Sequence, residues 1–458
     1  MVLRHALRSL LLVFTMVAGQ AFAGQVRTGP PAEIRALFDA FTQAMNSGSA
    51  DTWEAFVRAR FAPALAEKTT PQQRAQMYAM LAKDFGTITI ERVNREGPDA
   101  PLQLNVKGAS GNGVFILGID NSSPPRITSF GVEAGERGGP GADTLPPPLV
   151  DATLTNDEID RRLDGYFRKL AAAEVFSGVA LVARNGVPVF TGAFGLANRE
   201  RKIPNTIHTR FNIGSINKEF TQAAIRQLVR EGKLSLTDTL GKFFPDYLQS
   251  ASRAATVEQL LAHRAGLADF FGPEFNNAAK DRFASNADYF TFVSSRPPNF
   301  APGERNQYCN GCYIALGAIV AKVSGMPYEK YVADYIFTLA EMTSTGYPRS
   351  DRPADDIALG YTRREGDGTL RSNVAMHGVT GSAAGGGYST ALDLLTYSKA
   401  VQAGRFPGAE PGLGIAGGAP GINAVLEARG EWVVIVLSNF DPPVAERIGI
   451  GLANALAR

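Results

Sequence analysis

Residues 211–220, FNIGSINKEF, place Ser215 one helical turn before Lys218 and directly after a glycine. The apolar side chains that follow recur at helical spacing as far as Gly232, a residue type that commonly ends a helix. Residues three apart on a helix share a face, so the hydroxyl and the amine should lie together at the helix N-terminus. A desolvated lysine has a lowered pKa and can take the serine proton. The stretch predicts a nucleophilic serine, and the simpler alternative is a serine cap beside a lysine that reaches solvent.

The composition is that of an ordinary globular protein. The chain has 458 residues, of which 45% are hydrophobic and 20% are charged, and its formal net charge is +2. This length corresponds to two or three domains with ample core. The near-neutral charge gives no reason to expect a nucleic-acid partner.

The N-terminus has the pattern of an export signal. Arg4 and Arg8 precede a short apolar run at residues 10–14, and residues 21–23, AFA, offer an A-x-A cleavage site. The run is short for a membrane span, so a retained anchor is the less favoured alternative. We expect residues 1–23 to be a signal peptide and the mature protein to be periplasmic or secreted, with no stable membrane span after cleavage.

The two cysteines of the chain, Cys309 and Cys312, form a C-x-x-C pair. A zinc site needs four ligands, and the sequence has no second cysteine pair to complete one. A redox role would need a thioredoxin-like setting, which the flanking pattern does not suggest. In an oxidising compartment a local disulfide is plausible, and two buried thiols are the open alternative. We expect neither a metal nor another cofactor.

The rest of the chain divides into three parts. Residues 24–133 combine a helical pattern that begins at Ile34 with strand-like alternation from Ile88 onward. They predict a small α+β accessory domain, whose partner the sequence does not identify. Residues 134–150 are rich in glycine and proline and are typical of a linker. Residues 151–458 are expected to form one large domain.

The start of the large domain carries helix and hairpin signals. Thr155 or Asn156 can cap an amphipathic helix. Asn-Gly at residues 185–186 is a strong hairpin signal, and it separates strand-like residues 178–183 from residues 188–192.

The end of the large domain supplies another strand and a helix. Residues 432–437, WVVIVL, are apolar at every position, so this strand should be buried on both faces. A final helix is expected over residues 444–456. With a long helical middle, the pattern predicts that the two ends of the domain meet in one antiparallel sheet covered by helices.

Several stretches that follow FNIGSINKEF carry a specific resemblance. They are GKLSLTD (232–238), LLAHRAGL (260–267), YCN (308–310) and GGGYSTALDL (385–394). Over residues 176–445 the chain resembles the serine β-lactamase and penicillin-binding-protein superfamily, in particular the branch of class C β-lactamases, DD-peptidases and related esterases. The resemblance implies an α+β fold, with an antiparallel sheet flanked by helices and a mostly helical subdomain, here preceded by the small α+β domain.

The resemblance also implies roles for individual residues. Ser215 would be the nucleophile that forms an acyl-enzyme. Lys218 and Tyr308 would share proton transfer, with a tyrosinate stabilised by the lysine ammonium. Asn310 would hydrogen-bond an amide of the substrate or orient Lys218. For Tyr308 the simpler alternative is a packed aromatic whose hydroxyl finds any partner.

One motif departs from the family pattern of lysine or histidine, any residue, then glycine. The matching stretch is GLGIAGGAPG, residues 412–421, in which Ile415 occupies the cation position. A backbone N–H of Gly417 or Gly418 would still form an oxyanion hole with that of Ser215, and one such donor is worth about 3 kcal/mol. Without the cation, simple esters or neutral amides are expected as substrates rather than penicillins. A one-residue slip of the strand would instead point Ile415 into the core.

Two other interpretations remain open. A histidine base would have to be His208, His263 or His377, but no G-x-S-x-G elbow is present and His263 lies in a turn where histidine is usually structural. A non-catalytic binding or scaffold protein with the same fold is suggested by Ile415 and by the N-terminal domain. The sequence favours an exported serine hydrolase that acts on a small-molecule ester or amide through an acyl-serine intermediate.

Overall fold

The computed structural model describes residues 32–67, 69–95, 101–109, 113–120, 122–134, 150–364, 368–406, 408–409 and 412–457. The expected signal peptide and residues 135–149 of the expected linker lie outside the described residues. No helix within the described ranges is long and apolar enough to cross a bilayer. The chain divides into two compact units, one with most residues up to Gly131 and the other with those from Val132 onward. The domain boundaries drawn from the sequence stay predictions.

Helices followed by strands make up the first unit. In chain order they are α1 (Ala32–Asn46), α2 (Ala50–Arg60), α3 (Pro63–Ala66), α4 (Pro71–Phe85), β1 (Ile88–Asn94), β2 (Leu102–Gly108), β3 (Gly113–Ile119) and β4 (Ile127–Ala134). The strands form one sheet in the order β1-β2-β3-β4. Its core is aromatic, since the ring of Phe41 lies 5.0 Å from that of Phe115 and 6.2 Å from that of Trp53. The unit is thus a small α+β fold, as the sequence predicts.

The second unit holds the remaining elements. Its α-helices are α5 (Asn156–Ala172), α6 (Asn217–Arg230), α7 (Leu240–Phe243), α8 (Val257–Leu261), α9 (Pro273–Asn277), α10 (Asn286–Ser294), α11 (Asn310–Ser324), α12 (Tyr328–Val332), α13 (Ala391–Gln402) and α14 (Val444–Leu456). Its strands are β5 (Gly178–Arg184), β6 (Val187–Phe194), β7 (Leu196–Asn198), β8 (Ile203–Pro204), β9 (Phe211–Asn212), β10 (Tyr361–Thr362), β11 (Arg371–Ser372), β12 (Tyr388–Ser389), β13 (Leu413–Ala419), β14 (Ile422–Arg429) and β15 (Trp432–Ser438). Short 3-10 or π turns are η2 (Gly214–Ile216), η3 (Ser250–Ala254), η4 (Lys280–Arg282), η5 (Ala333–Phe337) and η6 (Val374–Met376).

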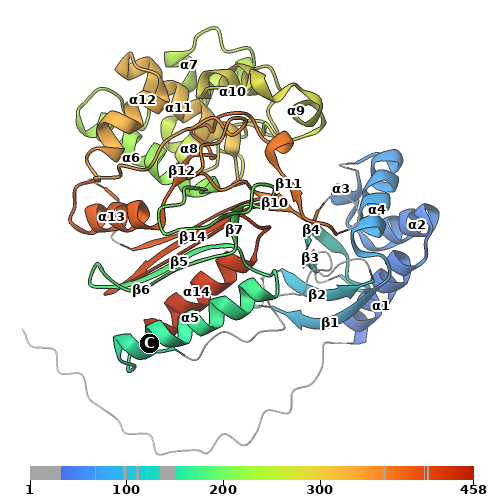
Figure 1. Cartoon of the computed structure of the whole chain (residues 1–458). Helices are drawn as coiled ribbons and strands as arrows, with labels where there is room; N and C mark the ends of the chain where they lie inside the picture. Colours follow the sequence, from blue (N-terminus) through green and yellow to red (C-terminus); the bar gives the residue numbers. More distant parts are fainter. Residues whose placement is uncertain are drawn as a thin grey trace, which may run out of the picture. The chain divides into compact units, whose positions relative to one another are not determined.

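Five antiparallel strands form the main sheet of this unit, in the order β13-β14-β15-β5-β6. Helices α5 and α14 cover one face, and α13 with the helical subdomain covers the other (Figure 1). In β15, Val433 and Ile435 belong to the core on the subdomain side, whereas Val434 and Val436 belong to the core under α5 and α14. Two cores therefore bury the unbroken apolar run of β15 on both faces, as predicted.

Local signals place the elements at the start of the domain. Thr155, not Asn156, caps α5: its hydroxyl accepts from the Glu158 N–H, and the Glu158 carboxylate accepts from the Thr155 N–H. Asn185 and Gly186 have φ of 52° and 73°, the positive values that a two-residue hairpin turn of type I′ requires. The predicted hairpin is therefore present between β5 and β6.

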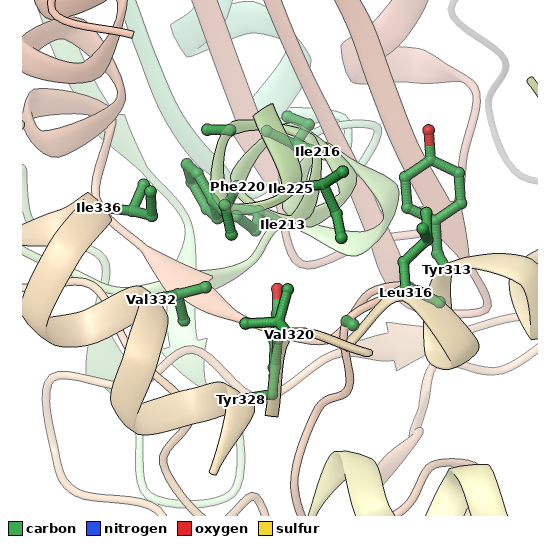
Figure 2. Close-up of a cluster of buried hydrophobic side chains, with 14 of the residues drawn as sticks. Ile213, Ile216, Phe220, Ile225, Tyr313, Leu316, Val320, Tyr328, Val332 and Ile336 are labelled. Carbon is green, nitrogen blue, oxygen red and sulfur yellow. The ribbon is translucent and has the colours of Figure 1, made fainter. Parts of the chain in front are cut away.

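Helix α6 packs against several elements of the helical subdomain. Figure 2 shows apolar side chains of α6 and of the turn before it next to those of α11, α12 and η5. All of them are buried: Ile213, Ile216, Phe220, Ile225, Tyr313, Leu316, Val320, Tyr328, Val332 and Ile336. The helix that follows the Ser-Lys motif is thus surrounded by protein, and its first residues are held rigidly. The predicted fold, an antiparallel sheet flanked by helices with a mostly helical subdomain, is confirmed.

Candidate active site

Ser215 lies on a tight turn between β9 and α6. The turn is η2, so the serine directly precedes the α-helix rather than forming part of its first α-helical turn. Gly214 has a φ of +51°, a conformation that side chains other than glycine adopt at a cost. Ile213 and Ile216 on either side of the serine are fully buried and anchor the turn, while Ser215 lines a cavity.

The amine of Lys218 is buried among hydrogen-bond acceptors. The residue is 4% exposed, and its Nζ lies 3.0 Å from Ser215 Oγ and 2.9 Å from Asn310 Oδ1. It also donates to the carbonyl of Ala384. An ammonium has three N–H donors, so these three acceptors satisfy it completely. In the neutral amine, two N–H groups serve Asn310 and Ala384, and the lone pair is left for the hydroxyl of Ser215.

Burial changes the charge state of Lys218. Desolvation lowers its pKa from 10.5 to about 7, and the carboxylate of Asp269 opposes this shift because it favours the ammonium. Both forms of the amine are therefore populated at neutral pH, which is the condition that a general base must meet.

Tyr308 is the second side chain that is hydrogen-bonded to the serine hydroxyl. Its OH lies 2.5 Å from Ser215 Oγ, and its ring centroid is 4.8 Å from the Nζ of Lys218. The residue is 55% exposed as a whole, but desolvation at the site raises the pKa of Tyr308, and the hydrogen bond with Ser215 opposes that rise. The raised pKa favours a phenol over the tyrosinate that the family resemblance implies.

Asp269 fixes the orientation of Asn310. Asn310 is the first residue of α11, and its Nδ2 donates to Asp269 Oδ2 at 2.8 Å. The amide oxygen must then face Lys218, so Asn310 can only accept from that amine. The sequence pattern indicates Asn310, but it misses Asp269, which follows the LLAHRAGL stretch by two residues.

Three consecutive carbonyls, which we call the 382–384 segment, accept from three side chains of α6. Asn217 Nδ2 donates to Ser382 O at 2.9 Å, Thr221 Oγ1 donates to Ala383 O at 2.7 Å, and Lys218 Nζ donates to Ala384 O. The segment is thereby aligned along the helix that carries the catalytic candidates. No side-chain pattern indicates it, because the acceptors are backbone atoms.

A disulfide flanks Asn310 and lies directly after Tyr308. Cys309 and Cys312 are joined, which decides between the two alternatives left open by the sequence. The N–H of Cys309 donates to His263 Nδ1 at 3.1 Å, and the ring of His263 stacks on that of Tyr308 at 4.9 Å. His263 therefore supports Tyr308, while the hydroxyl of Ser215 is hydrogen-bonded to tyrosine and lysine.

Strand β13 lies against the serine turn through Gly417. A Cβ added at Gly417 would lie 2.1 Å from the Ile213 carbonyl oxygen and 2.7 Å from the Ser215 nitrogen, so only glycine fits. Gly418 lines the cavity. The structure thus brings both glycines to the serine, and their part in an oxyanion hole stays a prediction. Ile415 packs against the buried core on the subdomain side and is not part of the cavity lining, so the side chain at the expected cation position does not face the cavity.

The cavity at Ser215 has a volume of about 380 Å³. Tyr308, Asn310 and Gly418 line it together with the serine, and His377 lies on its wall with Nε2 3.4 Å from the Pro420 carbonyl. None of the described residues that line the cavity is a lysine or an arginine. Within the described ranges, no three His, Cys, Asp or Glu side chains come together as a metal-ligand group.

Comparison with known proteins places this site in a family. Residues 163–410, more than half of the chain, match the Beta-lactamase family, and the chain belongs to it. A Bacillus subtilis (strain 168) protein named "Putative penicillin-binding protein PbpX" is 28% identical over 309 residues, which cover 61% of this chain and 74% of that protein.

Solved structures agree with this assignment. The penicillin-binding protein from Bacillus halodurans superposes with a TM-score of 0.56 at 28% identity, over 62% of this chain and 98% of that one. A class C β-lactamase superposes with a TM-score of 0.52 at 19% identity, over 67% of this chain and 98% of that one, a likeness of fold. The family and fold that the sequence motifs suggest are thus confirmed, and the family is one of serine hydrolases.

The close approach of β13 to the serine turn leads to a test with two neighbouring glycines. Gly417→Ala should force the strand away from Ile213 and Ser215 and should lower the free energy of unfolding by about 1–3 kcal/mol, the usual cost of overpacking. Gly418→Ala is the matched control, because its added Cβ would make only ordinary contacts, with Pro442 at 3.4 Å and the Ile422 carbonyl oxygen at 3.9 Å. Denaturant unfolding of both variants measures the difference. Equal stability of the two variants would contradict the packing described for β13.

Proposed function

We propose that the chain is a serine hydrolase that cleaves ester or amide bonds through an acyl intermediate on Ser215. The observation that carries the proposal is the position of Ser215 Oγ, 2.5 Å from the Tyr308 hydroxyl and 3.0 Å from the Lys218 amine, on the wall of a cavity. A nucleophile within hydrogen-bond reach of its base, which is itself oriented by a third group, is the arrangement that nucleophilic catalysis needs. Here Asn310 and the Ala384 carbonyl orient the base.

The charge states of the site support a particular order of proton transfers. Neutral Lys218 takes the proton of Ser215 as Oγ attacks the substrate carbonyl, and the negative charge develops on the carbonyl oxygen. The N–H groups of Ser215 and of Gly417 or Gly418 are the proposed donors to that oxygen. The Lys218 ammonium then gives this proton to the leaving alcohol or amine, beside the Tyr308 hydroxyl, which is hydrogen-bonded at Ser215 Oγ. A water molecule, deprotonated in the same way, cleaves the acyl-serine and restores the free hydroxyl.

The composition of the cavity supports neutral substrates. A carboxylate bound there would have to lose water, and no lysine or arginine among the described lining residues offers a charge-assisted hydrogen bond in exchange. Simple esters and neutral amides meet no such cost. We also propose, from the N-terminal sequence, that the protein is exported and acts in the periplasm or outside the cell.

A fluorophosphonate probe tests the proposed nucleophile. The wild-type protein should be labelled on Ser215, and Ser215→Ala should not be labelled at all. Ser235→Ala, which removes an exposed serine, is the control and should be labelled like the wild type. Mass spectrometry of the intact protein gives the readout. Labelling that persists in Ser215→Ala would refute the proposal, and an absence of both labelling and ester turnover would favour a non-catalytic binding protein.

The pKa of Lys218 leads to a pH prediction. The ammonium cannot accept a proton, so kcat/KM should be low below pH 7 and should rise as Lys218 loses its proton at about pH 7. Lys218→Arg keeps the positive charge but cannot deprotonate, and it should lose about 10²–10⁴-fold of the activity at every pH. Lys242→Arg, at an exposed lysine of α7, is the control. A Lys218→Arg protein that keeps its turnover would rule out a general base at this position.

Because Ile415 does not line the cavity, a cation meant to bind a substrate carboxylate should be introduced at another residue of β13. The wild type should hydrolyse a neutral ester with higher kcat/KM than nitrocefin, which carries a carboxylate. Ala419→Lys places a cation on the cavity wall and should lower the KM for nitrocefin, by less at high salt. Ile415→Lys should bring no such gain and should destabilise the fold, because its side chain packs on the core. Steady-state kinetics at two salt concentrations checks this, and a wild type that prefers nitrocefin would contradict it.

A further inference from the structure

One side of the cavity is built from aromatic rings. Phe270, Phe271, Phe275 and Tyr289 all line it, and we call them the aromatic wall. The rings of Phe270 and Phe271 lie 4.1 Å apart, and Phe270 meets Phe275 and Tyr289 edge-on at 5.0 and 5.1 Å. The two edge-on contacts have the separations and angles at which aromatic side chains attract one another.

Phe271 is the member of the aromatic wall that remains open to contact. It is 44% exposed, whereas the other three are at most 9% exposed. An exposed phenylalanine beside a buried aromatic cluster leaves apolar surface in contact with water. Covering that surface with another apolar group is favourable in free energy. The open ring lies in the cavity of the nucleophile, so a substrate is the molecule in a position to cover it.

Hydrogen bonds hold the backbone of the wall in place. The N–H of Phe271 donates to Asp269 Oδ1 at 3.0 Å, and Arg296 donates to the carbonyl oxygens of Asp269 at 2.6 Å and Phe270 at 3.3 Å. The ring of Phe271 is therefore carried by a fixed loop, and little conformational entropy is lost when a ligand binds against it.

The same aspartate links the wall to the reacting serine. Its other oxygen, Oδ2, accepts from Asn310, which in turn accepts from the Lys218 amine that is hydrogen-bonded to Ser215 Oγ. The wall begins at the residue after Asp269. Three consecutive hydrogen bonds thus join Asp269, at the start of the wall, to Ser215 Oγ, the atom next to which the substrate carbonyl must lie.

We propose that the aromatic wall binds an aromatic ring of the substrate, so that preferred substrates are neutral esters or amides with a phenyl-sized ring close to the bond that is cleaved. This inference rests on the proposed hydrolase function and adds the substrate class. A phenyl ring can pack edge-on or offset against Phe271 and its neighbours, whereas a cyclohexyl ring of similar bulk lacks the electrostatic part of that contact.

Two matched pairs of esters test the preference, and within each pair only the ring differs between phenyl and cyclohexyl. One pair varies the acyl part, methyl phenylacetate against methyl cyclohexylacetate, and the other varies the alcohol, benzyl acetate against cyclohexylmethyl acetate. Proton release by the full chain gives kcat/KM. In at least one pair the phenyl ester should be preferred by about tenfold. If the phenyl ester is preferred in neither pair, the inference is wrong.

Variants of Phe271 locate the preference. Phe271→Ala and Phe271→Leu should bring the phenyl-to-cyclohexyl ratio close to one, and the leucine keeps apolar bulk if the alanine variant fails to fold. Leu248→Ala, at a residue that is 67% exposed and outside the cavity lining, should leave the ratio unchanged. Labelling of Leu248→Ala by a small alkyl fluorophosphonate should match that of the wild type. A ratio that survives both substitutions at Phe271 would also overturn the inference.

A binding measurement separates this inference from the proposed reaction. The Ser215→Ala protein cannot form an acyl-serine, so the four esters can be titrated against it and followed by ligand-observed NMR. Tighter binding of a phenyl ester, lost in the Ser215→Ala/Phe271→Ala protein, supports the aromatic wall even if the wild type shows no turnover. Turnover of all four esters with equal binding and equal kcat/KM would refute the wall and leave the hydrolase function intact.

Discussion

A buried amine is costly unless each of its N–H groups meets an acceptor, and the site depends on how this fold satisfies that requirement for Lys218. The three acceptors come from the serine turn, from the start of α11 and from the 382–384 segment. These are distant in sequence, so the amine is satisfied only when α6, α11 and that segment are assembled together. The same assembly excludes water and brings the pKa of the lysine to about 7. The packing of the helical subdomain and the lowered pKa of Lys218 therefore have one common cause.

The position of the serine rests on a different constraint, the absence of side chains. The serine turn and strand β13 approach so closely that Gly417 leaves no space for a Cβ, and Gly214 adopts a positive φ beside it. Helices of the subdomain fix one side of the turn through Ile213 and Ile216, and the edge of the sheet fixes the other. The hydroxyl is thus held between two layers of the domain, within hydrogen-bonding distance of both Tyr308 and Lys218.

The sequence predicts the elements whose signals are local. The apolar run of β15, the Asn-Gly turn and the Ser-Lys spacing each indicate a feature that the structure contains, because strand burial, turn geometry and helical periodicity depend on few residues. Asp269 was not indicated, since an aspartate after a turn has many possible partners. The direction of the Ile415 side chain could not be predicted from the sequence, because strand register decides which face of the sheet a side chain lies on. In the structure this side chain packs against the core. The roles of Ser215, Lys218, Tyr308 and Asn310 stay predictions.

The 382–384 segment has a consequence for how such a site can vary. Its three carbonyl oxygens accept from Asn217, Thr221 and Lys218, and every amino acid supplies the same carbonyl. The side chains of the segment can therefore drift within the limits of the space around them. An insertion or deletion of one residue, however, would move each carbonyl away from its donor on α6, and Lys218 would lose one of its three hydrogen-bond acceptors. The register of this segment therefore depends on its length, and much less on the chemistry of its side chains.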